Sequence, residues 1–310
     1  MNILLILAPL ILSLLSLEII NKQFLKKNIV DKIVDRSSHN AIATRSGGLS
    51  IFFTIFIISV FFYFNNSEIF DFSILIPLGI LLLVGTYDDI YNVDFKLKFI
   101  FQIIAAKILI DYGYVVDNLH GVFGIYEINR IFSQLLSIFI VLAIINAINF
   151  IDGVDGLAIT IVSLFIILFE FLSVKSTSFF NLSTIVIFSI IPALYYNYRK
   201  KNKIFLGDSG SLFLGGLISV YIMHIISSEY LIKKNFDINK IFYVFSIFIY
   251  PIIDLCRIVF FRLINGKSPF EADRNHIHHY LVDKLHDHYK VVLIIIMFSM
   301  IGFTLIHLLI

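Results

Sequence analysis

The sequence predicts an all-α, polytopic integral membrane protein with about ten transmembrane helices. Composition is the first reason: of 310 residues, 59% are hydrophobic and 15% are charged, and the mean hydropathy is +0.93. A soluble domain carries about a quarter charged residues. The second reason is segment length, because the chain divides into apolar stretches close to the ~20 residues that an α-helix needs to cross a bilayer.

The same composition excludes several classes of protein. It leaves no room for a cytosolic enzyme with a separate soluble domain, for a nucleic-acid binder or for a disulfide scaffold. Cys256 is the single cysteine and cannot form an internal disulfide, and a formal charge of +2 is too small to steer polyanions across the surface. Since no repeat, low-complexity tract or Pro-rich linker interrupts the chain, residues 1–310 are expected to form one membrane domain.

The predicted spans follow one another along the whole chain. They lie at about 3–20, 47–63, 72–87, 98–116, 131–151, 156–173, 179–197, 208–226, 241–263 and 290–310. The fourth stretch is weak because Lys107 and Asp111 interrupt it, but the alternation of loops on either side requires a crossing there.

The distribution of basic residues predicts the orientation. With ten crossings, the loops at 21–46, 88–98, 198–207 and 257–290 lie on one side and hold 18 of the 24 Lys and Arg residues. Cytoplasmic loops carry the excess of positive charge. These loops are therefore expected in the cytoplasm and both termini outside.

Acidic side chains collect at the cytoplasmic ends of these spans. Ionisable groups are costly at membrane depth and mark functional positions. Five carboxylates end or begin different predicted helices: Asp88, Asp89, Asp152, Asp155 and Asp208. Together in a low-dielectric site they would repel one another unless protonated or neutralised. Mg²⁺ would neutralise them, but it binds through one or two carboxylates plus substrate phosphates, so the others are expected to bind substrate or handle protons.

Glycines and basic groups extend this prediction to an anionic ligand. Gly153, Gly156, Gly207 and Gly210 lie where helices are expected to begin, so backbone N–H groups could approach an anion closely. Carboxylates, a cation and helix N-termini together predict a diphosphate site. Lys98 and the basic residues of the last loop would supply further positive charge.

Each feature taken alone has a structural explanation. An Asp at a helix start is most often an N-cap, Asp88–Asp89 could be a solvated loop, and helix-terminal glycines usually form turns. Asp254 and Arg257 are three residues apart in the ninth stretch and are expected to form a structural ion pair. These explanations do not account for all the clusters falling on one face of the membrane.

The motifs, in this order, resemble the polyprenyl-phosphate N-acetylhexosamine-1-phosphate transferases, membrane enzymes that start cell-envelope polysaccharide synthesis. The resemblance is carried by Thr44–Gly48, Asp88–Asp89, Asn146–Leu157, Phe205–Ser211 and Asp254–His279. The last segment is similar to the branch that uses a simple UDP-N-acetylhexosamine, although ten spans differ from the eleven often drawn for that branch.

The resemblance implies transfer of N-acetylhexosamine 1-phosphate, with N-acetylglucosamine as the leading donor sugar, from a UDP-sugar to undecaprenyl phosphate with release of UMP. It further implies Mg²⁺ as cofactor (Mn²⁺ as a substitute), a cytoplasmic active site, the bacterial inner membrane and a homodimer. The implied metal ligands are Asp208 and Asn146, and the implied catalytic carboxylates are Asp88, Asp89 and Asp208. The implied substrate-binding residues are Lys98, Asn149, Asp152, Asp155, Phe205, Arg274, His276, His278 and His279.

The route of the transfer stays open at this point. A lipid phosphate has its second pKa near ~6, so a strong base is not needed to activate it. Direct in-line displacement is therefore preferred to a phosphoryl-enzyme formed on a carboxylate.

The function itself also has alternatives. They are phospho-N-acetylmuramoyl-pentapeptide transfer, which shares the core motifs, a secondary transporter and a catalytically silent membrane scaffold. A transporter is disfavoured because the acidic motifs end on one face instead of lying at the bilayer midplane.

Overall fold

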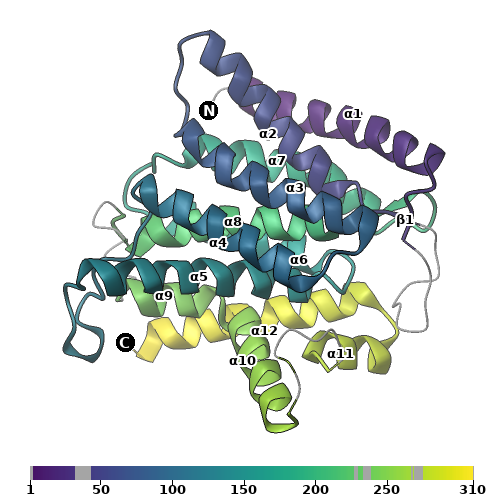
Figure 1. Ribbon diagram of the computed structural model, residues 1–310. Helices are drawn as coiled ribbons and strands as arrows, with labels where there is room; N and C mark the ends of the chain where they lie inside the picture. Colours follow the sequence, from purple (N-terminus) through teal and green to yellow (C-terminus); the bar gives the residue numbers. More distant parts are fainter. Residues whose placement is uncertain are drawn as a thin grey trace.

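The computed structural model describes residues 3–31, 43–226, 230–232, 239–266, 268 and 275–309, and within them the chain is almost entirely helical (Figure 1). The first helices are α1 (Leu4–Lys26), α2 (Gly47–Phe64), α3 (Leu75–Tyr91), α4 (Phe95–Asp111), α5 (Arg130–Ile151) and α6 (Leu157–Leu172). They are followed by α7 (Phe180–Asn197), α8 (Gly207–Ile226), α9 (Lys240–Ile247), α10 (Ile249–Ile264), α11 (Ile277–Leu285) and α12 (His288–Leu309). The short elements are the 3₁₀ turns η1 (Phe72–Ile74) and η2 (Val122–Gly124) and the strands β1 (Ala43–Thr44) and β2 (Lys203–Ile204). The predicted all-α class is confirmed.

Every predicted apolar stretch coincides with a helix or a pair of helices. Among the described residues, seven helices are long and apolar enough to cross a membrane, and the bent pair α9–α10 would make eight. The helices α4 and α6 are shorter, with 17 and 16 residues. The charged residues that interrupt the fourth stretch, Lys107 and Asp111, pair with each other along α4, and this helix ends at Asp111 instead of continuing to residue 116. The chain is thus a multi-pass membrane protein.

Helix α8 lies at the centre of the bundle. Of its most apolar window, 94% is buried, and it packs against α2, α3 and α5. Glycines permit the closest approaches: a Cβ on Gly48 of α2 would lie 2.1 Å from the Gly210 Cα, and one on Gly85 of α3 would lie 2.5 Å from the Asp208 carbonyl oxygen. The backbones of α2 and α3 therefore hold the start of α8 in place.

The ninth predicted span is wrong as a single helix. The stretch 241–263 is divided into α9 and α10, whose axes differ by 80°, and Figure 1 shows α10 leaving the bundle. Pro251 lies in the first turn of α10. Proline has no N–H and its ring clashes with the carbonyl four residues earlier, so Pro251 favours a break here, although α7 continues through Pro192. The helix breaks at Phe248.

The two short strands join segments that are far apart in the sequence. β1 pairs in parallel with β2, Ala43 beside Lys203 and Thr44 beside Ile204. The pairing continues beyond the strands, because the amide of Gly47 donates to the carbonyl of Phe205 at 3.0 Å. This connection places the loop before α2 against the loop before α8.

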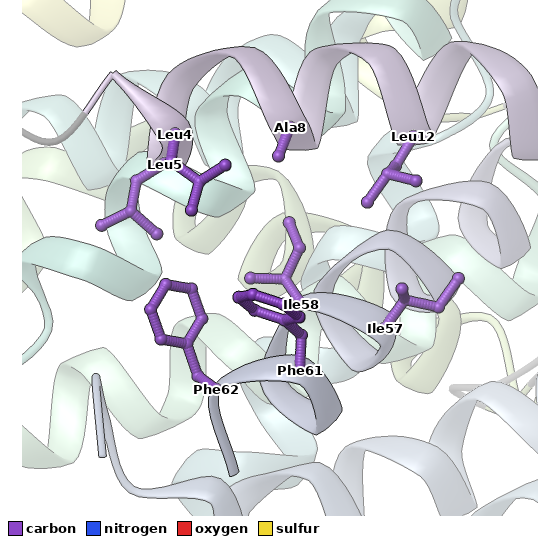
Figure 2. Close-up of a pocket in the computed structure, with 8 residues that line it drawn as sticks. All are labelled: Leu4, Leu5, Ala8, Leu12, Ile57, Ile58, Phe61 and Phe62. Carbon is purple, nitrogen blue, oxygen red and sulfur yellow. The ribbon is translucent and has the colours of Figure 1, made fainter. Parts of the chain in front are cut away.

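An apolar pocket lies between α1 and α2 and has a volume of about 200 Å³ (Figure 2). Its lining consists of Leu4, Leu5, Ala8, Leu12, Ile57, Ile58, Phe61 and Phe62. These residues come from the start of α1 and the end of α2, whereas near the other ends of these helices Thr44 of β1 donates a hydrogen bond to Asn21 of α1. Since every lining side chain is a hydrocarbon, this pocket is not a site for polar chemistry.

Candidate active site

Lys98 joins two of the predicted carboxylates. Helix α3 ends at Asn92 in the left-handed conformation, and α4 begins after Asp94, whose side chain caps it. This short turn folds α4 back beside α3, so that Lys98 Nζ lies 3.1 Å from Asp88 Oδ2 and 2.9 Å from Asp208 Oδ2. Side-chain exposure is 17% for Lys98 and 10% for Asp88. Residues from α3, α4 and α8 thus form one charged cluster, as the sequence predicted.

Asp89 is held by the start of α8. Its carboxylate accepts hydrogen bonds from the amides of Asp208 at 2.9 Å and Ser209 at 3.0 Å, and its side chain is 1% exposed. Helix N-termini carry unpaired N–H groups and a positive partial charge, so Asp89 acts as a cap supplied by another helix. Gly207 has φ +76°, and a Cβ there would lie 2.6 Å from Asp89 Oδ2. The glycine makes this close approach possible.

Arg45 is a site residue that had no role in the sequence-based prediction. Its guanidinium lies 3.5 Å from Asp89 Oδ1 and 2.5 Å from Asp31 Oδ1. Burial by itself lowers the pKa of Arg45, but the carboxylates of Asp89, Asp31 and Asp208 outweigh it and raise the pKa. The available signal was its position in the Thr44–Gly48 motif.

Asp152 adds another carboxyl group to the cluster. Burial, followed by the neighbouring carboxylates of Asp208 and Asp89, raises the pKa of Asp152 well above the ordinary value of an aspartate. Asp88, Asp89, Asp152 and Asp208 interact with the cations Lys98 and Arg45, so carboxylates outnumber cations. An excess of buried negative charge favours a bound cation or protonation.

The two predicted asparagines have different surroundings. Asn149 donates from its amide nitrogen to the hydroxyl of Ser211 on α8 at 2.8 Å. Asn146 donates to Gln102 Oε1 of α4 at 2.9 Å and to the Leu142 carbonyl at 2.8 Å. Because these bonds use the amide nitrogen of Asn146, its oxygen is the atom that could bind a cation.

A second charged cluster surrounds Asp155. Asp155 Oδ2 lies 2.5 Å from Lys203 Nζ and 2.9 Å from His288 Nδ1, and Lys203 Nζ lies 5.2 Å from the centre of the Phe205 ring. The predicted residues Asp155 and Phe205 therefore share Lys203. Sequence reasoning missed Lys203 and His288, because nothing in the local pattern links positions so far from Asp155.

This pairing predicts a pH dependence of stability. Burial raises the pKa of Asp155, but the hydrogen bonds and charges of His288 and Lys203 outweigh it and hold the pKa below the ordinary value. A carboxylate with a depressed pKa stabilises the fold above its unfolded pKa of about 3.9 and loses this effect as the pH falls through the folded value. At pH 6 we expect Asp155→Asn to unfold more easily by about 1–3 kcal/mol.

The measurement is thermal unfolding of both proteins in detergent between pH 6 and pH 3. The difference between wild type and Asp155→Asn should shrink below pH 4. Asp117→Asn, which changes an exposed carboxylate, serves as the control. A difference that stays constant over this range would contradict the assignment.

The histidines of the last loop approach the same region. His278 is fully buried, and a Cβ on Gly153 would lie 2.8 Å from His279 Cε1 and 3.4 Å from His278 Nε2. His276 stacks on His278, with ring centres 5.1 Å apart and planes 17° apart. The structure therefore brings these histidines against the turn that follows Asp152. The remaining predicted residue, Arg274, lies outside the described residues.

Comparison with known proteins identifies a matching family and several similar relatives. A family model described as glycosyl transferase family 4 matches residues 71–226. The chain is 31% identical over 289 residues to the probable undecaprenyl-phosphate N-acetylglucosaminyl 1-phosphate transferase of Bacillus subtilis (strain 168), which covers 92% of this chain and 77% of the relative. It is 29% and 28% identical to the undecaprenyl-phosphate alpha-N-acetylglucosaminyl 1-phosphate transferases of Salmonella typhi and Escherichia coli (strain K12), each match covering 83% of this chain and 70% of the relative.

Proposed function

Because the chain belongs to glycosyl transferase family 4, we propose that it transfers N-acetylglucosamine 1-phosphate from UDP-N-acetylglucosamine to undecaprenyl phosphate and releases UMP. The names of the relatives support this donor and this acceptor, and they favour neither a muramoyl-pentapeptide donor nor a transporter. The observation that carries the proposal is the cluster of Asp88, Lys98, Asp89 and Asp208, drawn from three helices to one end of a membrane bundle.

The residues of this cluster fit a magnesium ion. Its donors are oxygens, which Mg²⁺ prefers, and its carboxylates outnumber its cations. Asp208 and the oxygen of Asn146 would hold the ion, with Mn²⁺ as a substitute. Bound Mg²⁺ would neutralise charge on the phosphate oxygens during transfer.

The two neighbouring carboxylates differ in what they can do. Asp89 is nearly inaccessible and its oxygens accept the first amides of α8, so its role in our proposal is to fix the backbone that carries Asp208. Asp88 interacts with Lys98, and we assign to Asp88 the task of orienting the acceptor phosphate or taking its proton. Lys98 offers a positive charge to an entering phosphate.

This division of roles supports direct in-line displacement. The acceptor phosphate is largely dianionic at neutral pH because its second pKa is about 6, so it can attack the β-phosphate of the UDP-sugar without a strong base. Electrostatic positioning then supplies most of the catalysis. Isolation of a covalent sugar-phosphate adduct on an aspartate, formed without lipid, would contradict this route.

The substrates and the charges of the loops support the proposed orientation. The donor is water-soluble, whereas the acceptor is a lipid whose phosphate lies at the membrane surface. We place the cluster at the cytoplasmic face of the bacterial inner membrane, with both termini outside, because the loops beside it carry most of the Lys and Arg residues. A homodimer stays a prediction.

The test is an assay of detergent-solubilised protein with a panel of radiolabelled UDP-sugars, undecaprenyl phosphate and Mg²⁺. We expect UMP release and lipid-linked product with UDP-N-acetylglucosamine and none with UDP-N-acetylmuramoyl-pentapeptide. Chelation by EDTA should lower the rate at least about 100-fold, and Mg²⁺ or Mn²⁺ should restore it. Activity with the pentapeptide donor alone, or full activity after chelation, would overturn the corresponding part of the proposal.

A further inference from the structure

Two residues of α10 contact the histidines of the last loop, although neither was predicted to have a role in the reaction. Asp254 Oδ2 lies 2.7 Å from His276 Nδ1, and the Tyr250 hydroxyl lies 2.9 Å from His278 Nδ1. Tyr250 is 3% exposed and Asp254 is 1% exposed. Because they are four residues apart, one face of α10 contacts both rings.

These contacts determine which ring nitrogens are left for a ligand. An ionised carboxylate only accepts hydrogen bonds, so His276 carries a proton on Nδ1 and presents Nε2 elsewhere. His278 Nε2 is buried and has no hydrogen-bond partner among the described residues. It lies against Gly153, next to Asp152. A buried polar atom without a hydrogen-bond partner indicates that a bound ligand supplies the missing hydrogen bond.

Hydrogen bonding explains the arrangement of Asp254, His276 and His278 better than a bound metal ion does. Asp254, His276 and His278 each offer a donor atom within 4.8 Å of the others. Two ligand atoms around a tetrahedral Zn²⁺ lie about 3.4 Å apart when each bond is about 2.05 Å, whereas Asp254 Oδ2 and His276 Nδ1 are closer, at 2.7 Å. Arg257 is bonded to the other Asp254 oxygen at 3.0 Å, and its charge opposes a second cation. The predicted Asp254–Arg257 ion pair is confirmed and belongs to this network.

The break between α9 and α10 makes the network possible. An unbroken helix would carry Tyr250 and Asp254 along the axis of α9, whereas the 80° bend directs α10 out of the bundle. In this direction α10 passes α5, where Arg262 lies 5.5 Å from the centre of the Phe150 ring. The Phe150 ring in turn lies 5.4 Å from that of His276.

We propose that Tyr250 and Asp254 are positioning residues, which hold Nδ1 of His278 and His276 so that the Nε2 side of the stacked rings faces oxygens of the UDP-sugar beside Asp152 and Gly153. This inference rests on the proposed function. It adds α10 to the donor site, whereas the acceptor phosphate is assigned to Asp88 and Lys98.

Steady-state kinetics of Asp254→Asn and Tyr250→Phe separate donor from acceptor effects. For UDP-N-acetylglucosamine we expect kcat/KM to fall about 10–100-fold, the range found for groups that orient a metal-binding histidine. The KM for undecaprenyl phosphate should stay within about twofold of the wild-type value, because Tyr250 and Asp254 hold the histidines assigned to the donor, whereas the acceptor phosphate is assigned to Asp88 and Lys98. Cys256→Ser, an exposed position on α10, is the matched control and should behave as wild type.

A double-mutant cycle tests whether Asp254 acts through His276. In a His276→Ala background, Asp254→Asn should have little further effect, because the ring that it holds is absent. The same holds for Tyr250→Phe in a His278→Ala background. If Asp254→Asn does not fold, Tyr250→Phe, which removes a single hydroxyl, carries the test.

Three results would overturn the inference. The first is wild-type kinetics in both Asp254→Asn and Tyr250→Phe. The second is a loss of activity from these substitutions that is as large in the histidine-to-alanine background as in the wild-type background. The third is an equal rise of the KM values for donor and acceptor. In each of these cases active wild-type protein leaves the proposed function intact. A wild-type protein that does not release UMP from UDP-N-acetylglucosamine would contradict the proposed function and this inference with it.

Discussion

Replacing Asp208 by asparagine is expected to lower kcat for UMP release by about 10³-fold, the range seen when a group that stabilises developing charge is removed. The substitution keeps the shape of the side chain but removes its negative charge. Asp208 lies at the first turn of α8, is 25% exposed and contacts Lys98 Nζ at 2.9 Å, and in the proposed mechanism it would hold the cation that binds the substrate phosphates. KM for the donor should change far less than kcat if the carboxylate acts mainly in the transition state.

The same variant should fold normally. Asp208 repels the neighbouring carboxylates of Asp88, Asp89 and Asp152, so removal of its charge relieves repulsion, but it also removes the ion pair with Lys98. Because these two effects oppose each other, we expect a thermal midpoint close to that of wild type. Asp117→Asn, at an exposed position, is the control and should retain full activity. An active Asp208→Asn protein would remove the central residue of the proposed mechanism.

Gly48→Ala is expected to have the largest effect on stability. The added Cβ would lie 2.1 Å from the Gly210 Cα and 2.2 Å from its nitrogen. These are backbone atoms of a buried helix, so relief requires α2 and α8 to separate. Overpacking of this kind destabilises by about 1–3 kcal/mol and occasionally more. Activity should fall as well, because the displaced segment of α8 carries Asp208.

Gly79→Ala is the matched control. Gly79 lies inside α3, and a Cβ there would meet the Phe52 ring at 3.5 Å, which is ordinary van der Waals contact. In a helix, alanine is favoured over glycine by up to about 1 kcal/mol. Thermal unfolding in detergent should therefore show a lower midpoint for Gly48→Ala and an unchanged or higher one for Gly79→Ala. Equal midpoints would mean that the α2–α8 contact is looser than the structure indicates.

Most of the helical architecture could be predicted because a bilayer acts on each segment separately. A stretch such as 131–151 must bury its own backbone polar groups in hydrocarbon, and a helix is the way to do so. The failures occurred where a local feature competed with this rule. The ninth stretch is divided into α9 and α10 near Pro251. The fourth helix ends at Asp111, which pairs with Lys107, instead of continuing to residue 116.

The site was predictable in outline for a related reason. The predicted alternation of spans places Asp88, Asp89, Asp152 and Asp208 at one face of the membrane, so the sequence could predict their proximity without the details of packing. Their individual partners did not. Asp89 and Asp208 are 119 residues apart, and no local pattern indicates that the first carboxylate caps the helix of the second. Lys203, His288 and Tyr250 were missed for a similar reason, because each is remote in sequence from the residue that it contacts.

The amino-acid sequence by itself determined that this protein is a helical, multi-pass membrane protein and which family its motifs resemble, because hydropathy and short motifs are properties of contiguous residues. Tertiary structure alone decided that Lys98 links Asp88 to Asp208 and that Asp89 accepts hydrogen bonds from the first amides of α8. It also decided that α10, bent away from α9, forms hydrogen bonds with two histidines. These facts depend on angles between helices and on glycine contacts between backbones, which form only when distant segments pack together.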